Sequence, residues 1–157
     1  TFYLYFKDKY EVQDYLIAKQ ANLIFARAHE KLAQRSGQEN RSSFEEGITF
    51  LVNCIIDQLN ENPAILRFIS KNLSWAVFSN IRFSEWDNQS CMDIFDMLLE
   101  QSKKKYRQKE LMIYMIVELV NATCYNVILN HVPVTLEKLK EELYTTIHGI
   151  LHQFECA

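Results

Sequence analysis

Apolar side chains recur at helical spacing along most of the chain, and few residues interrupt the pattern. Asp8 and Glu11 form an N-cap pair, and from there neither glycine nor proline occurs before Gly37. The pattern therefore predicts one helix of about 27 residues, which is long for a globular protein. Its apolar stripe includes Val12, Leu16, Leu23, Ala26 and Leu32. A polar loop over residues 36–42 follows.

Capping residues and prolines divide the rest of the chain into further helices. Ser43 and Glu46 have the spacing of a capping box, and Pro63 suits the first turn of a helix. Thr135 can cap the last helix, with Glu137 favourably placed in its first turn. In chain order, the expected helices span about residues 43–62, 63–72, 73–83, 90–99, 108–130 and 135–154. The last two are joined by a short turn, which predicts a helical hairpin.

The composition supports a protein built only of helices. Three glycines and two prolines in 157 residues are too few for the turns of a β-sandwich or for a glycine-rich dinucleotide-binding turn. Apolar residues make up 48% of the chain, enough for the core of one domain. Gly47 and Gly149 fall inside predicted helices, where each costs about 1 kcal/mol relative to alanine. We therefore expect close helix approach at these two glycines.

Charge and cysteine content indicate which partners and which cellular compartment to expect. With 17 Lys and Arg against 20 Asp and Glu, the net charge of −3 argues against a grip on nucleic acid over a large surface. The four cysteines stand far apart without a CxxC pair, and no signal peptide is recognisable. We expect reduced thiols in a cytoplasmic protein, each buried as a small apolar side chain. They are Cys54, Cys91, Cys124 and Cys156.

Residues 111–129 form the most apolar stretch, with Glu118 as the only charged side chain. A carboxylate near the middle of a membrane span costs about 2.5–3.5 kcal/mol, so we expect a helix buried in protein and no membrane contact. Because this helix is apolar on nearly all sides, one neighbour within the chain does not cover it, whereas a second subunit would. Glu118 either anchors a cationic or hydrogen-bonding ligand, or forms an ion pair or faces solvent.

Motifs of catalysis are absent from the sequence, so we expect neither an enzyme nor a cofactor. His148, His152 and Cys156 recur every four residues along the last helix. That spacing spreads them too far for one shared ion, and we expect no metal site. The basic residues within 103–109 are expected to mark a solvated helix end rather than an anion site.

Aromatic and polar residues of the middle helices are the candidates for a ligand pocket. Aromatic side chains are more often core than pocket, yet this many, with interspersed Asn and Tyr, can enclose a cavity. The candidate pocket residues are Trp75, Phe78, Phe95, Tyr114, Glu118, Asn121 and Tyr125.

The first twelve residues carry the most specific pattern in the chain. They follow T-x-Y-x-(H/Y)-F-x-x-K-x-x-(L/V), with matches at Thr1, Tyr3, Tyr5, Phe6, Lys9 and Val12. This pattern resembles the end of the helix-turn-helix and the start of the long connecting helix in TetR-type transcriptional repressors. The resemblance implies that Tyr3, Tyr5 and Lys9 contact DNA phosphates, because phenol and ammonium donors at a helix N-terminus suit a phosphate. Phe6 would wedge the DNA-binding domain onto the next helix.

The order of the predicted helices is also similar to that family. The resemblance implies an all-α bundle of the TetR-repressor C-terminal type that dimerises through a four-helix bundle. Residues 1–7 would be the remnant of a helix-turn-helix domain whose front helices are missing, and residues 8–157 the effector-binding and dimerisation domain. The dimer interface would use the apolar stripe of the terminal hairpin, which comprises Ile128, Leu139, Leu143, Ile147, Ile150 and Leu151.

Two functions remain open from the sequence. The resemblance implies a homodimeric repressor that binds operator DNA and a small lipophilic or cationic effector, whose binding changes the spacing of the paired DNA-binding heads. The alternative is a helical dimerisation or protein-interaction module without a small-molecule ligand. A cavity of several hundred Å³ lined by the candidate aromatics favours the first function. A solid core with an ion-paired Glu118 favours the second.

Overall fold

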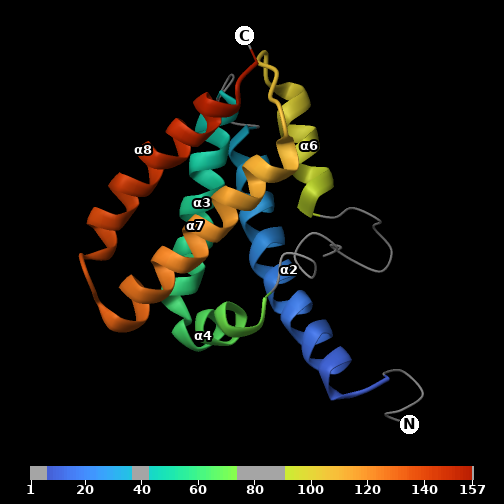
Figure 1. Cartoon of the computed structure of the whole chain (residues 1–157), viewed down its shortest axis with the longest axis vertical. Helices are drawn as coiled ribbons and strands as arrows, with labels where there is room; N and C mark the ends of the chain where they lie inside the picture. The colour runs from blue at the N-terminus through green and yellow to red at the C-terminus, as the bar shows by residue number, and fades with distance from the viewer. Residues whose placement is uncertain (1–6, 37–42, 74–90, 157) are drawn as a thin grey trace.

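The computed structural model describes residues 7–36, 43–73 and 91–156, which form six helices (Figure 1). In chain order they are α2 (Lys9–Ser36), α3 (Phe44–Glu61), α4 (Pro63–Asn72), α6 (Cys91–Gln101), α7 (Lys109–Asn130) and α8 (Leu136–Phe154). The described residues contain no strand beyond an isolated pairing of Tyr106 with Glu155, so the predicted all-α fold is confirmed. The helix expected over 73–83 and the cap expected at Ser90 lie outside the described residues.

The predicted helix starts form through the expected side-chain caps. Asp8 Oδ1 accepts a hydrogen bond of 3.0 Å from the backbone N–H of Glu11, and α2 then runs for 28 residues. Ser43 Oγ accepts from the Glu46 backbone at 3.2 Å, and the Glu46 carboxylate accepts from the Ser43 backbone at 3.3 Å. Thr135 caps α8 in the same way, with its side-chain oxygen 3.3 Å from the Lys138 backbone nitrogen. These caps set helix boundaries that match the sequence pattern closely.

Helix α3 lies at the centre of the bundle, in contact with α2, α4, α6, α7 and α8. Figure 1 shows α2 on one side of α3 and α8 on the other, with α7 crossing in front of α3 and α4 at the lower end. The first turns of α2 extend beyond the other helices, towards the N-terminal end of the chain. The C-terminal part of α2 therefore belongs to the core, while its N-terminal part projects from it.

The loop between α6 and α7 is tied to the end of α8. The backbone N–H of Arg107 donates to the Phe154 carbonyl at 2.9 Å, and that of Cys156 donates to the Lys105 carbonyl at 2.7 Å. Lys104 Nζ lies 3.1 Å from Glu45 and 2.6 Å from Glu155. These contacts raise the pKa of Lys104 and lower the pKa of the Glu155 carboxyl. The basic run is thus an exposed loop whose Lys104 is paired with two carboxylates.

The apolar stripe of the terminal hairpin packs inside the chain itself. Leu143, Ile147 and Leu151 are at most 2% exposed in the single chain, because α8 turns this stripe towards α7 and α3. Leu139 and Ile128 are also buried, and Ile150 is half-buried. For the five buried residues the prediction of a dimer interface is therefore wrong, since a partner subunit could not reach side chains already enclosed, whereas for the half-buried Ile150 it stays a prediction.

Helix α7 is long and apolar enough, by length and composition alone, to cross a membrane, as core helices of soluble proteins also are. Within the bundle it runs along α8 and also contacts α4 and α3. Its other side remains uncovered, with Leu111, Tyr114 and Met115 exposed to 43%, 39% and 37%. Neighbours within the described part of the chain thus cover only part of this apolar helix, as expected.

The two helical glycines do not lie at close helix contacts. Among the described residues, a Cβ placed on Gly47 would meet the Leu32 side chain at an ordinary 4.0 Å, and one placed on Gly149 would meet none of them within 4 Å. The expectation of close approach is therefore wrong for Gly47, and at Gly149 it is not met within the described part of the chain.

Three of the four cysteines are buried, as expected, but the expectation is wrong for Cys156, which is exposed near the end of the chain. Burial raises the pKa of the Cys91 thiol to about 12 and that of Cys124 to about 11. The pKa of Cys54 is also raised, again chiefly by burial. These three thiols stay protonated near neutral pH and behave as small apolar side chains.

Candidate functional site

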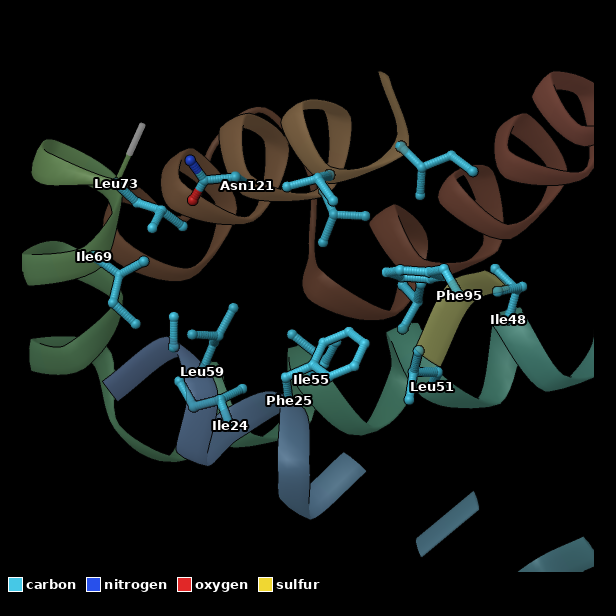
Figure 2. A pocket seen from close by; sticks show the side chains of 15 residues that line it. Ile24, Phe25, Ile48, Leu51, Ile55, Leu59, Ile69, Leu73, Phe95 and Asn121 are labelled. Carbon is cyan, nitrogen blue, oxygen red and sulfur yellow. The ribbon is translucent and has the colours of Figure 1, made fainter. Parts of the chain in front are cut away.

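A cavity of about 110 Å³ lies in the middle of the bundle, between α2, α3, α4, α6 and α7 (Figure 2). Its walls are almost entirely aliphatic. The lining residues are Ala21, Ile24, Phe25, Ile48, Leu51, Val52, Ile55, Leu59, Ile69, Leu73, Phe95, Ile116, Val117, Val120 and Asn121. The cavity is smaller than the several hundred Å³ expected from the sequence, so it suits a small ligand.

Helical periodicity explains why each helix contributes apolar groups to this space. On α2, Ala21, Ile24 and Phe25 lie three and four residues apart, which places them on one face. Phe25 meets Phe95 of α6 edge to face, with ring centroids 5.4 Å apart and an angle of 61° between the rings. This aromatic pair joins α2 to α6 at the wall of the cavity (Figure 2).

Asn121 on α7 is the one polar side chain among the described lining residues. Its side-chain oxygen accepts a hydrogen bond of 2.9 Å from Ser70 Oγ on α4. This bond fixes the orientation of the amide and joins α4 to α7. An otherwise apolar space therefore has a single hydrogen-bonding group at its wall.

A second polar contact holds α2 against α3 beside the cavity. Gln58 Nε2 on α3 donates to the backbone carbonyl of Ile24 at 2.9 Å. Because Ile24 also lines the cavity, this hydrogen bond links the position of the α2 backbone to the cavity wall.

Of the five candidate pocket residues within the described part of the chain, the structure brings two to the cavity, Phe95 and Asn121. Tyr125 is half-buried and Tyr114 is exposed, and neither is among the lining residues. Trp75 and Phe78 lie outside the described residues.

Glu118 lies on the exposed side of α7 and is not among the residues that line the cavity. The hypothesis that a buried Glu118 anchors a cationic ligand is therefore wrong. The solvent-facing alternative is confirmed, since α7 turns the neighbouring Ile116 and Val120 inward in its place.

Sequence reasoning missed the aliphatic wall, which includes Ile24, Leu51 and Ile69. Their spacing marks them as inward-facing, and in that respect they are identical to any core residue. No sequence signal distinguishes a lining isoleucine from a fully packed one, because the gap arises from the distances between helices.

The candidate DNA-contact residues are mostly outside the described part of the chain. Tyr3 and Tyr5 fall in residues 1–6, which the structure does not describe. Lys9 is the first residue of α2 and is exposed, with its ammonium 5.2 Å from the ring centroid of Tyr10. It stands at the helix N-terminus, where a phosphate would be favoured.

The histidines of α8 lie in separate surroundings. His148 Nε2 is 2.8 Å from Thr49 Oγ1 on α3, whereas His152 Nδ1 is 3.5 Å from the Glu155 carboxylate. Within residues 7–36, 43–73 and 91–156, no group of three His, Cys, Asp or Glu side chains is placed to hold a metal ion. The site chemistry that the described residues offer is binding of an apolar molecule.

Comparison with known proteins adds no assignment: no protein-family model, curated protein or solved structure significantly matches this chain.

Proposed function

We propose that this chain is the effector-binding and dimerising part of a TetR-like transcriptional regulator in the cytoplasm. The observation that carries the proposal is the course of α2. This helix begins at Lys9, within the segment that resembles the end of the DNA-binding domain, and it lines the cavity at Ile24 and Phe25. One continuous helix thus spans about 24 Å from the expected DNA-binding end to the cavity.

The projecting part of α2 supports the same proposal. Tyr10, Tyr15 and Leu16, all in the N-terminal part of α2, are 63%, 48% and 45% exposed. The first turns of this helix extend beyond the bundle (Figure 1). A DNA-binding head seated at the start of α2 would cover side chains of this kind. Large apolar groups on a projecting helix are typical of a surface that contacts another folded unit.

The proposed mechanism is coupling between the cavity and the DNA-binding heads. A ligand in the cavity contacts Ile24 and Phe25 and favours one position of α2 over another. Because a helix is stiff, a shift at these residues moves the Lys9 end, and in a dimer it changes the separation of the two heads. A difference of a few kcal/mol between the two positions is sufficient for regulation.

The dimer surface in this proposal is the outer face of the hairpin. Leu111, Tyr114 and Met115 provide exposed apolar area on α7, whereas the exposed side of α8 is mainly polar. A second copy of the chain packed around α7 would bury these three side chains and form a four-helix bundle from two hairpins.

The proposal is tested by measuring ligand binding and the movement of α2 in the same protein. A thermal-shift screen of neutral aromatic compounds and lipophilic cations identifies ligands, since a compound at 100 times its Kd adds about 2.7 kcal/mol of stability. Spin labels on Asp14→Cys, in a Cys156→Ser background, then report the distance between the two α2 helices of a dimer. We expect a bound compound to change that distance. A monomeric chain, a screen without binders, or an unchanged distance would each contradict the proposal.

The alternative is a helical interaction module without a small-molecule ligand, and the exposed apolar face of α7 favours it. That face serves a protein partner as well as it serves a second copy. The two functions predict different effects of a substitution that fills the cavity with a larger side chain. An interaction module should still bind its partner, whereas a ligand-responsive regulator should lose its response to the ligand.

A further inference from the structure

We propose that residues 153–156, at the end of α8, form a latch that holds α6 in place, and that release of this latch frees α6 while the other described helices stay folded. The inference does not rest on the proposed function, because it concerns only how the described helices are fastened to one another. It makes α6 a separately moving part of the fold.

The latch joins two stretches of backbone, the loop between α6 and α7 and the end of α8 (Figure 1). The N–H of Arg107 donates to the Phe154 carbonyl at 2.9 Å, and the N–H of Cys156 donates to the Lys105 carbonyl at 2.7 Å. The two stretches run antiparallel. A pair of such bonds fixes the loop against the end of α8 in a single register.

The side chain of Arg107 strengthens the latch. Its guanidinium lies 4.9 Å from the ring centroid of Phe154, and its Nη2 donates to the Gln153 carbonyl at 3.3 Å. Phe154 is only 2% exposed and belongs to the core. The loop is therefore fastened to a side chain that is itself firmly held.

The loop is also held by the first turn of α3. Lys104 Nζ lies 2.6 Å from the Glu155 carboxylate of the latch and 3.1 Å from that of Glu45 on α3. The buried Tyr106 packs on Phe44, with ring centroids 5.4 Å apart. The latch thus connects the loop to both α8 and the central helix.

Helix α6 depends on this loop more than the other described helices do. It has 11 residues, and a helix this short is marginal without tertiary contacts. Among the described helices it packs mainly on α3 and reaches α2 through Phe95, whereas α2 with α3 and α7 with α8 pack more extensively. Its last turn leads directly into the loop, where the N–H of Ser102 donates to the Leu99 carbonyl at 3.1 Å. Loss of the latch should therefore act on α6 first.

Movement of α6 would reach the cavity. Phe95 of α6 lines the cavity and meets Phe25 of α2, so a released α6 withdraws part of the described wall. Residues 153–156 are not among the described lining residues. The latch therefore gives the fold a way to alter the cavity wall from outside the cavity.

Hydrogen exchange read by mass spectrometry on the 157-residue chain tests the latch with two substitutions at one position. Cys156→Pro removes the N–H that donates to Lys105, and the preceding Glu155 already has a ψ of 137°, in the range that a following proline favours. Cys156→Ser keeps this N–H and is the matched control. We expect the amides of α6 to exchange about three- to tenfold faster in Cys156→Pro than in Cys156→Ser, as the loss of one hydrogen bond allows, with α3 and α7 unchanged.

A second pair of variants tests the charged part of the latch in the Cys156→Ser chain. Lys104→Gln removes both ion pairs of the loop and should also speed exchange in α6, by a smaller factor because solvent reaches these pairs. Lys138→Gln removes two exposed ion pairs elsewhere on α8, with Glu141 and Glu142, and should leave α6 unchanged.

The buried thiols give a second reading of the same event. Cys91 is the first residue of α6 and has no exposure, and Cys124 is equally buried on α7. Iodoacetamide should modify Cys91 faster in Cys156→Pro than in Cys156→Ser, while Cys124 stays equally slow in both.

Two outcomes would overturn the inference. Unchanged exchange of α6 in Cys156→Pro would show that the latch does not hold this helix. Equal acceleration in α3, α6 and α7 would show that α6 opens only when the whole bundle unfolds. Neither outcome bears on the proposed function, which is decided by the ligand screen and the distance between the α2 helices.

Discussion

Tyr144 on α8 donates a hydrogen bond of 2.7 Å to the side-chain oxygen of Asn53 on α3. Both side chains are half-buried, and burial together with the nearby Asp57 raises the pKa of Tyr144 to about 12. The phenol therefore remains a proton donor at any ordinary pH. This contact ties the terminal hairpin to the central helix, together with the contact of His148 with Thr49 and the ion pair of Lys140 with Asp57. The apolar contacts around them do not specify register.

Replacing Tyr144 by phenylalanine should lower the free energy of unfolding by about 1 kcal/mol, since the Asn53 oxygen loses its donor. Urea denaturation followed by circular dichroism measures the change. Tyr10→Phe, at a position 63% exposed, is the matched control and should have almost no effect. If the hydrogen bond is the cause, adding Asn53→Ala to Tyr144→Phe should cost less than the sum of the two single changes.

Charged substitutions on the two sides of the hairpin should have different consequences. Ile147→Glu places a carboxylate at a position with no exposure and should cost more than about 4 kcal/mol, which leaves the chain unfolded. Met115→Glu, at a position 37% exposed, should leave the fold intact and, under the proposed function, yield a monomer. Light scattering measures the oligomeric state of each variant, and circular dichroism measures whether it is folded. If Ile147→Glu instead yields a folded monomer, the apolar stripe of the terminal hairpin is the subunit interface after all.

Alanine at Gly47 should stabilise the protein by about 0.5–1 kcal/mol, because a helical glycine loses more backbone entropy on folding than alanine does. Among the described residues the added methyl group meets Leu32 at 4.0 Å, an ordinary contact distance that adds no strain. Thermal unfolding measures the increase. Gly149→Ala should stabilise an isolated chain in the same way, whereas a loss of stability that appears only at dimer-forming concentrations would place a partner subunit at Gly149.

Thiol labelling should separate Cys156 from the other three cysteines. The exposed Cys156 should react with Ellman's reagent rapidly at pH 8, and the three buried thiols should react only when the chain unfolds. Burial keeps them protonated and out of reach, with the pKa of Cys91 raised to about 12. In Cys156→Ser the rapid phase should disappear. A rapid reaction in that variant would show that one of the buried helix faces opens readily.

The ion pair between Lys104 and Glu155 predicts a stability difference that depends on pH. Lys104 lowers the pKa of Glu155 in the folded protein, so the stabilisation is present above the unfolded-state pKa near 4.5 and is lost as pH falls through the lower folded-state value. Glu155→Gln should therefore melt below the unsubstituted protein at pH 7, with the gap closing under acid conditions. Solvent reaches both side chains, so added salt should also narrow the gap. A gap that persists at low pH would mean that another interaction of Glu155 is responsible.

Helix boundaries were predictable because they depend on residues close together in sequence. Asp8, Ser43 and Thr135 cap their helices through side-chain bonds to a backbone three residues later, and Pro63 occupies the first turn of α4. Such contacts form within one turn, so the order of residues is sufficient to place them.

The candidate site was only partly predictable. Asn121 and Phe95 were identified as pocket residues, whereas Glu118 was a pocket candidate with a solvent-facing alternative, and it lies outside. The 22-residue helix α7 is apolar on nearly all sides, so the sequence does not show whether a given residue on it faces inward or outward. The periodicity that orients an amphipathic helix is then absent, and only the neighbours in space decide.

By itself, the sequence determined that the described part of the chain is helical and where most of its helices begin and end. The apolar stripe predicted for α2 was partly wrong, because Leu16 and Leu23 are exposed while the neighbouring Ile17 and Ile24 are buried. The tertiary structure decided which neighbour covers each apolar face. It placed Leu143 and Ile147 against their own chain rather than a partner, left Met115 exposed, and left a cavity beside Asn121. The physical reason is that apolar burial has no direction: a side chain gains as much against any surface that excludes water, so the partner is chosen by how whole helices pack.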